Sequence, residues 1–429
     1  MTTTTRFSGL TLRPHQFTVP LDYANPGGET ITVFARTVVA TARENDALPW
    51  LVFLQGGPGF SAPRPDGKSG WLKRALQEYR VLLLDQRGTG RSSPITFQTL
   101  ARFSPAEMAA YLKHFRADAI VQDAEFIRRR LAGENTRWSV LGQSYGGFCG
   151  VHYLSAAPDG LREVFFTGGL PSLVRSVDEV YRATYQRTLD KNALYYARYS
   201  DDAARTQEIV RRLLEEPVAL PVGGWLSPQR VQQLGMGFGA SYGFETVHYL
   251  LEGAFVEGIN GLEFNFVFLR GVENVHPFDT NPIYAILHEA IYCQGEASRW
   301  AAERVRAEFP AFELAADRPV MFTGEMIYPS MFDDFAYLRP LKEAAHILAE
   351  DADWPRLYDV SALQANTVPC AAAIYYNDMY VERTFSEETA RTIRGIKTWV
   401  TSEYEHNGLR ADGEKVLGRL IDMARGEIS

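Results

Sequence analysis

Through residues 1–171, short apolar runs alternate with longer stretches that mix apolar and polar residues at helical spacing. The apolar runs lie at 51–54, 81–84, 139–141 and 164–166, and the helical stretches lie at 104–114 and 119–131. Continuous apolar strands separated by helices are typical of a parallel sheet that is covered on both faces. Two earlier extended segments, at 16–19 and 30–35, predict an antiparallel pair that enters this sheet.

A different pattern begins near residue 172. Segments such as 202–214 and 297–309 combine Arg, Glu, Ala and aromatic residues at helical spacing. Strand patterns return at 368–376 and 396–401, and the segment 413–426 predicts a closing helix. We therefore predict an α/β domain formed by residues 1–171 and 364–429, which is interrupted by a helical cap domain of residues 172–363.

Composition and charge narrow the classes of protein that fit. The chain has 429 residues, of which 46% are hydrophobic and 22% charged, enough for one large core or two moderate ones. A formal net charge of -8, without a run of five basic residues, argues against a nucleic-acid-binding or membrane-binding surface. The first residues lack a signal-peptide pattern, and no segment reaches the ~18 apolar residues of a membrane span. We expect a cytoplasmic protein.

The three cysteines do not indicate a disulfide framework or a metal site. Cys149, Cys293 and Cys370 are widely spaced and form no C-x-x-C pair. We expect reduced thiols packed as small apolar groups, and we expect neither a metal nor an organic cofactor.

Residues 142–147 read GQSYGG and directly follow an apolar run that predicts a strand. They contain the G-x-S-x-G pattern, in which a tight strand-to-helix turn lifts a serine hydroxyl clear of the sheet. The turn needs small neighbours because its central residue is held at positive φ. An ordinary turn that happens to contain a serine is the alternative explanation of the motif. In this context we expect Ser144 to be a nucleophile.

A serine nucleophile needs a base, and a histidine base needs a carboxylate to orient it. His406 follows the last expected strand, whereas the other seven histidines lie in N-terminal or helical contexts. Asp378 directly follows the strand expected at 368–376. Other acidic residues in this region are the alternatives: Glu382, Glu403 and Glu405. The chain order of serine, acid and histidine is the one expected of α/β-hydrolases.

Glycine-rich and charged loops follow two other expected strands. Residues 55–59 read QGGPG, so the backbone N–H groups near Gly57 and of Tyr145 can point at a developing oxyanion. A phosphate loop is disfavoured because the Lys-Ser/Thr of that motif is missing, and a plain turn is the other alternative. Residues 85–92 read DQRGTGRS, and there we expect Asp85 and Arg87 to brace neighbouring loops without a catalytic role.

Three motifs together, GGPG at 56–59, DQRGTGRS at 85–92 and GQSYGG at 142–147, resemble the proline iminopeptidase (prolyl aminopeptidase) family in its longer bacterial branch. The resemblance implies an α/β-hydrolase fold, with a mostly parallel central sheet flanked by helices and a large helical cap inserted before the last strands. It also implies a serine peptidase that releases an N-terminal residue, preferentially proline, from peptides. One departure is Gln55, where the family usually has histidine.

An enzyme that reads a free N-terminus must bind a cationic imino group, and a buried cation requires carboxylates nearby. The resemblance implies that cap glutamates hold this group. Three glutamates of the expected cap stand among apolar and aromatic residues: Glu289, which looks most like a family residue, Glu325 and Glu245. A structural ion pair is the simpler explanation for each. Nearby aromatic residues either wall a slot for the proline ring or form the core of the cap: Phe238, Tyr242, Phe244, Tyr292, Tyr328 and Phe332.

Two other functions stay open at this point. A carboxylesterase or amidase of the same fold would share the triad but would not need acidic residues in the pocket. A non-catalytic ligand receptor of this fold would not need the hydroxyl of Ser144.

Overall fold

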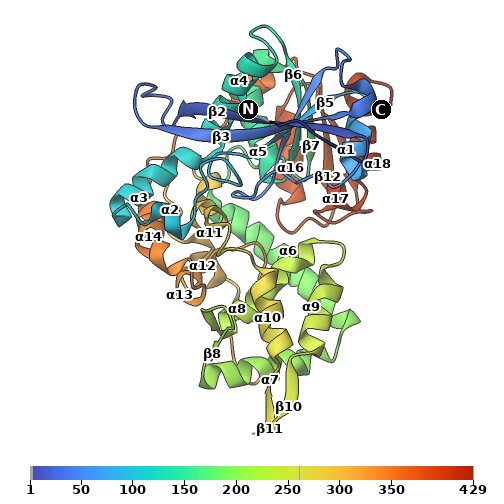
Figure 1. Ribbon diagram of the computed structural model, residues 1–429. Coiled ribbons are helices and arrows are strands. Elements are labelled where there is room, and N and C mark those ends of the chain that lie inside the picture. The colour runs from blue at the N-terminus through green and yellow to red at the C-terminus, as the bar shows by residue number, and fades with distance from the viewer. Residues whose placement is uncertain (1–2, 260, 429) are drawn as a thin grey trace.

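The computed structural model describes residues 3–259 and 261–428, and it centres on a nine-stranded sheet (Figure 1). The strand order is β1-β2-β3-β5-β4-β6-β7-β12-β13. From β5 to β13 in this order the strands run parallel, whereas β1, β2 and β3 extend the sheet by antiparallel pairing. The strand bounds are β1 (Thr5–Phe7), β2 (Leu10–Pro20), β3 (Thr30–Ala40), β4 (Trp50–Leu54), β5 (Arg80–Leu84), β6 (Trp138–Gln143), β7 (Leu161–Thr167), β12 (Cys370–Tyr375) and β13 (Lys397–Thr401).

Helices cover both faces of this sheet (Figure 1). Those outside the long insertion are α1 (Gly70–Ala75), α2 (Phe97–Leu100), α3 (Pro105–Leu112), α4 (Ala117–Leu131), α5 (Tyr145–Ala156), α16 (Arg383–Thr392), α17 (Gly408–Ala411) and α18 (Gly413–Arg425). The prediction of a mostly parallel sheet flanked by helices, entered by an antiparallel pair, is confirmed.

The two faces of the sheet bury alternate side chains of the same strand, because neighbouring residues point to opposite sides. In β4, Leu51 and Phe53 pack into a core with α1 and α18. Val52 and Leu54 point to the other face, into the core that contains α4 and α5. Burial on both faces explains why the strands read as continuous apolar runs.

The insertion lies between β7 and β12, and most of it is helical (Figure 1). Its helices are α6 (Val177–Arg198), α7 (Asp202–Glu215), α8 (Pro228–Gln232), the 3-10 helix η4 (Gln233–Gly239), α9 (Gly243–Glu252), α10 (Phe266–Val275), α11 (Pro282–Leu287), the 3-10 helix η5 (Glu289–Ile291), α12 (Ala301–Arg306), α13 (Met331–Asp334), α14 (Lys342–Glu350) and α15 (Val360–Gln364). It also contains two short hairpins, β8 (Val218–Ala219) with β9 (Trp225–Leu226) and β10 (Phe255–Gly258) with β11 (Gly261–Phe264).

Residues of the insertion belong to two different hydrophobic cores. One belongs to the insertion and includes Tyr195, Phe238 and Phe322. The residues of α11 and α14 instead share the core of the α4 and α5 face, and α14 packs against α3. Part of the insertion is therefore continuous with the sheet domain in its packing. The domain bounds 1–171, 172–363 and 364–429 stay a prediction.

Some elements of the insertion differ from the sequence pattern. The helix expected at 202–214 is present as α7, but the one expected at 297–309 is reduced to α12. The reason is local: Arg299 and Trp300 adopt φ of 49° and 55°, which no α-helix accommodates. The two hairpins were not expected, because their strands are too short to show a period of two residues.

Among the described residues, no helix is long and apolar enough to cross a membrane. The three cysteines are buried and unpaired, as expected.

Candidate active site

Ser144 lies in the sharp turn between β6 and α5, with φ 54° and ψ −125°. Glycines make this turn possible. A Cβ on Gly142 would lie 2.5 Å from the carbonyl oxygen of Gly146, and a Cβ on Gly146 would lie 1.9 Å from that of Leu54. No side chain fits at either position, so the G-x-S-x-G spacing follows from the close approach of α5 to the sheet. The backbone N–H of Ser144 donates to Thr167 at 3.0 Å, which holds the strained turn in place.

His406 and Asp378 form the hydrogen-bonded pair that a serine nucleophile requires. His406 Nδ1 lies 2.7 Å from Asp378 Oδ2, and the two side chains are only 7% and 1% exposed. The other carboxylate oxygen of Asp378 accepts the backbone N–H groups of Tyr380 at 2.9 Å and Val381 at 3.1 Å. Burial lowers the pKa of His406, but the charge and the hydrogen bond of Asp378 outweigh burial and leave the pKa raised. With Nδ1 held by the carboxylate, Nε2 is the basic nitrogen.

Two consecutive glycines after β7 bring the imidazole and the serine together. A Cβ on Gly168 would lie 3.1 Å from His406 Nδ1, and a Cβ on Gly169 would lie 2.4 Å from the carbonyl oxygen of Ser144. His406 and Ser144 therefore face the same short piece of backbone. Among the described residues, no hydrogen bond joins Ser144 Oγ to the imidazole. Such bonds are often long in enzymes without substrate and shorten in the complex.

The loop after β4 packs directly on the nucleophile. A Cβ on Gly56 would lie 2.8 Å from Ser144 Cβ, so position 56 has no room for a side chain and the loop backbone packs against the serine. Tyr145 is the first residue of α5, and its N–H is one of the groups that find no acceptor within a helix. Gly57 adopts φ 132°, a value that favours glycine. This arrangement supports the N–H groups of Gly57 and Tyr145 as oxyanion donors, a role that stays a prediction.

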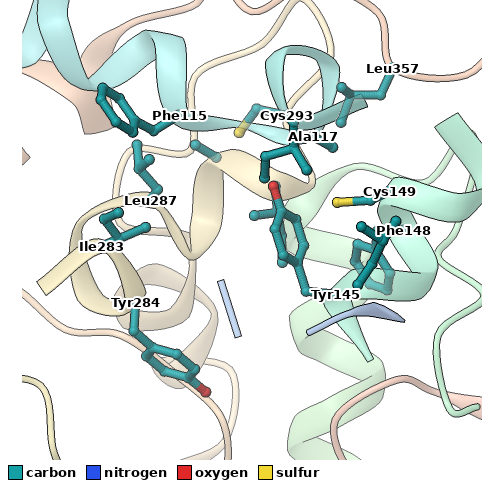
Figure 2. Close-up of a cluster of buried hydrophobic side chains, with 14 of the residues drawn as sticks. Phe115, Ala117, Tyr145, Phe148, Cys149, Ile283, Tyr284, Leu287, Cys293 and Leu357 are labelled. Atoms are coloured by element: carbon teal, nitrogen blue, oxygen red, sulfur yellow. The ribbon is translucent and has the colours of Figure 1, made fainter. Parts of the chain in front are cut away.

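Figure 2 shows the side chain of Tyr145 lying among apolar residues, with its hydroxyl pointing towards Ala117. The hydroxyl is buried and has no hydrogen-bond partner among the described residues. The ring packs in the same core as Phe148 and Cys293. The side chain of Tyr145 is therefore structural, and its backbone N–H is the group available to a substrate.

Glu325 adds a carboxylate of the insertion beside the triad. Burial raises the pKa of Glu325 to about 7, while the charge of His406 and a hydrogen bond from Tyr284 act to lower it. Glu325 lies deep in the protein, although the residue is not fully buried. Among the described residues, no Lys or Arg pairs with this carboxylate. A buried carboxylate without a cation is costly unless a ligand supplies the positive charge.

Tyr284, in α11, holds Glu325 in this position. Its hydroxyl donates a hydrogen bond to Glu325 Oε1 at 2.5 Å. The ring of Tyr284 lies between those of Phe278 and His288, with centroid separations of 5.2 Å and 4.9 Å. It also makes an edge-to-face contact with Phe60, in the loop after β4, with ring centroids 5.6 Å apart. One tyrosine thus connects Glu325 to the loop that packs on Ser144.

Comparison with known proteins found relatives of this chain. The family model described as "alpha/beta hydrolase fold" matches residues 49–206. Over 418 residues the chain is 54% identical to a protein named proline iminopeptidase from Aeromonas sobria, and 97% of each chain is covered. Over 426 residues it is 36% identical to proline iminopeptidase aneH from Aspergillus aculeatus, covering 96% of this chain and 93% of that one. The chain belongs to the proline iminopeptidase family. A crystal structure of a proline iminopeptidase from Mycobacterium smegmatis matches 96% of this chain and 100% of its own, at 13% identity and a TM-score of 0.45.

Glu289 has a structural explanation in this member of the proline iminopeptidase family. Its carboxylate accepts the backbone N–H groups of Ala302 at 2.9 Å and Ala301 at 3.2 Å, at the N-terminus of α12. Burial raises the pKa of Glu289 to about 7, although these N–H groups act to lower it. Both carboxylate oxygens are thus occupied by backbone donors. An amine-binding role for Glu289 stays a prediction that the geometry supports less well than the same role for Glu325.

Glu245, in α9, has partners of its own. Its carboxylate lies 2.6 Å from Arg198 Nη1 and accepts a hydrogen bond from the Tyr199 hydroxyl at 3.2 Å. The side chain is 38% exposed. These contacts do not involve the triad, so the structure brings Glu325 to the catalytic residues and leaves Glu245 in a surface ion pair.

The aromatic residues expected around the proline slot also lie in different parts of the structure. Phe238 and Phe244 pack on Tyr195 in the core of the insertion. Tyr292 instead contacts Phe148 in α5, the helix that directly follows Ser144. Of these three residues, Tyr292 contacts the helix that follows Ser144.

Residues from distant segments hold His406 and its loop, and sequence reasoning missed them. The backbone N–H of His406 donates to the carbonyl of Gly239 at 3.1 Å. Lys191, in α6, lies 2.6 Å from the carboxylate of Glu405. The ring of Tyr380 meets the imidazole edge-on, with centroids 4.8 Å apart. No sequence pattern identifies these positions, because each residue supports His406 only through a contact with a segment that is distant in the chain.

The charged loop after β5 braces its neighbours, as expected. Asp85 forms an ion pair with Arg64 at 2.5 Å, and the buried guanidinium of Arg87 lies 2.6 Å from Asp123. These pairs fix the loop without reaching the nucleophile.

Gln55, the departure from the family pattern, is held through its backbone. The side-chain amide of Gln86 donates to the carbonyl of Gln55 at 3.1 Å. The loop that carries Gly57 is therefore anchored to the neighbouring strand end without a histidine at position 55.

Proposed function

We propose that this chain is a serine aminopeptidase that releases an N-terminal residue, preferentially proline, from peptides. The relatives named proline iminopeptidase support this activity. The observation that carries the proposal is the unpaired, deeply placed carboxylate of Glu325 next to the triad. A cationic imino group is the ligand that such a carboxylate favours.

In the proposed reaction, the imino cation binds Glu325 and brings the first peptide carbonyl to Ser144. His406 Nε2 takes the hydroxyl proton as Oγ attacks the carbonyl carbon, and the N–H groups of Gly57 and Tyr145 stabilise the oxyanion. The C–N bond breaks when His406 returns the proton to the leaving amine. Water, deprotonated by the same imidazole, then hydrolyses the acyl-enzyme and frees Ser144.

The raised pKa values of His406 and Glu325 determine how the proposed activity falls at acidic pH. Catalysis needs neutral His406, so it is lost as the pH falls through the raised pKa of His406. Binding of a cationic substrate also needs ionised Glu325, whose pKa lies near 7 in the free enzyme. Substrates with a free amine should therefore lose activity on acidification earlier than neutral substrates do.

The decisive assay compares aminoacyl arylamides that carry free or acetylated amines. We expect the free prolyl compound to be cleaved fastest, and acetylation to remove most of the activity because it abolishes the charge. Equal cleavage of both forms would favour the alternative of a general amidase or esterase. If wild type and Ser144→Ala both bind a peptide but hydrolyse nothing, a receptor is the better description.

Peptides with a free N-terminal proline are the substrates that we propose. A cytoplasmic location is also proposed, and the unpaired state of the three buried cysteines supports it.

A further inference from the structure

A pocket of about 280 Å³ opens where the insertion begins. Three segments form its wall: the connection from β7 to α6, the turn after η5 and the stretch that leads into α15. The lining residues used below are Val174, Arg175, Tyr292, Glu296 and Arg356. None of these residues belongs to the triad, and the proposed mechanism gives the pocket no role.

The pocket is close to the catalytic centre. Gly169 lies against Ser144, and Leu173 of the pocket wall follows four residues later, a span of at most ~14 Å even if fully extended. Tyr292 provides a second connection, because its ring is 5.8 Å from that of Phe148 in α5. Burial raises the pKa of Tyr292, and the charges of Glu325 and Asp378 add to this effect, as expected for a residue between the pocket and the triad.

Arg356 presents a free guanidinium on a rigid support. On one side, Arg116 donates to the carbonyl of Pro355 at 2.6 Å. On the other side, the backbone N–H of Leu357 donates to Gln294 at 2.9 Å. The side chain of Arg356 is exposed and forms no hydrogen bond or ion pair with any residue that the structure describes. Because the backbone is held on both sides of Arg356, less conformational entropy is lost when a ligand binds this arginine.

The other charged groups of the pocket are less available to an anion. Arg175 is committed to Glu179 at 3.1 Å and Glu388 at 2.8 Å. Glu296 lines the same pocket but does not pair with Arg356. Exposed Val174 adds an apolar surface at the rim. Arg356 is therefore the cation that an incoming carboxylate would meet unpaired.

This inference rests on the proposed function. An aminopeptidase that fixes the amine at Glu325 has room for one residue on that side of the nucleophile, so the rest of the peptide must extend the other way. We propose that the pocket receives the residues after the scissile bond, and that Arg356 binds the C-terminal carboxylate of short peptides. A guanidinium suits this task because it pairs with a carboxylate through two parallel hydrogen bonds.

The test uses Pro-Gly, Pro-Gly-Gly and Pro-Gly-Gly-Gly, each as the free acid and as the C-terminal amide. We expect wild type to prefer the acid at one of these lengths, and Arg356→Gln to lower kcat/KM for that acid by about 5- to 20-fold, mainly through KM. The matching amide should change less than about 2-fold, because it carries no charge for the arginine to bind. Arg356→Lys should retain part of the preference.

Arg137→Gln is the matched control. This arginine is also exposed and unpaired among the described residues, but it precedes β6 at the end opposite Ser144. Its replacement should leave every acid-to-amide ratio unchanged. If no peptide length shows an acid preference in wild type, or if Arg356→Gln lowers acid and amide alike, the assignment is wrong. A wild type that cleaves no prolyl peptide would instead overturn the proposed function.

Discussion

The sheet edge and the insertion contribute different groups to one site, and they hold them differently. Ser144 directly follows β6 and Asp378 lies three residues after the end of β12, and the glycines around Ser144 pack too closely for any side chain to replace them. Glu325 lies in a stretch of the insertion without regular secondary structure, and the Tyr284 hydroxyl is its hydrogen-bond partner. The sheet therefore fixes a general hydrolytic apparatus, whereas the insertion adds a charge whose position depends on tertiary contacts.

This contrast separates chemistry from selection. In the proposed mechanism the triad attacks any carbonyl that reaches Ser144, so its loss should affect all substrates. In the same mechanism Glu325 binds the amine, so its loss should affect only substrates that carry the positive charge. Variants of the two regions should consequently differ in pattern as well as in size.

The largest effect is expected at the nucleophile. Ser144→Ala should lower kcat by about 10⁴-fold or more for prolyl arylamides and for neutral aryl esters alike, because both reactions need the acyl-enzyme. Steady-state rates on both substrates, together with a thermal unfolding curve that matches wild type, check this outcome. Appreciable turnover of either substrate would show that another group attacks the carbonyl.

A smaller and selective effect is expected at the insertion. Glu325→Gln should reduce kcat/KM for free prolyl arylamide by about 10²- to 10³-fold, because the substrate cation loses its buried partner. Glu245→Gln is the matched control, since it removes the carboxylate of a partly exposed ion pair and should change the rate by less than about 3-fold. Comparable losses in the two variants would argue against a special role for Glu325.

The hydrogen bond from Tyr284 should appear in the pH profile. Tyr284→Phe removes a donor that favours the ionised form of Glu325, so the pKa of Glu325 should rise from about 7. The acidic limb for prolyl arylamide should then move to higher pH by about one unit, because a hydrogen bond to a charged group contributes roughly 1.5 kcal/mol. The acidic limb for a neutral ester, which His406 sets, should not move to higher pH, because the charge of Glu325 helps to raise the pKa of His406 and its loss acts in the opposite direction. A common shift for both substrates would place the effect on the histidine.

The smallest effect is expected where the insertion braces the histidine loop. Lys191→Gln removes the ion pair with Glu405 and should lower kcat by roughly 3- to 10-fold through a small displacement of His406. Because this contact does not reach the amine, prolyl and neutral substrates should be affected equally. A loss confined to the prolyl substrate would assign Lys191 to selection instead.

The same contrast explains what the sequence could predict. The apolar runs, the G-x-S-x-G turn and the order of Ser144, Asp378 and His406 were visible because each depends on local geometry or on the end of a strand. The shortened α12 and the two hairpins were not, since positive φ at Arg299 and very short strands leave little periodic signal.

The cap glutamates show where local reasoning stops. Glu289, Glu325 and Glu245 all stand among apolar and aromatic neighbours in the sequence, yet one meets a helix N-terminus, one the triad and one an arginine. Tyr284 could be found only after the fold placed α11 next to Glu325. Partners that are distant in the chain decide the role of a buried charge, and no window of sequence contains them.

The most direct test of a charge-selecting insertion compares two substrates of nearly equal shape, the aryl esters of proline and of cyclopentanecarboxylic acid, on wild type and Glu325→Gln. The account predicts that the substitution lowers kcat/KM for the prolyl ester by about 10²-fold or more and changes the cyclopentane ester by less than about 3-fold. An equal loss on both esters would mean that Glu325 supports the site without reading the amine, and it would contradict the account.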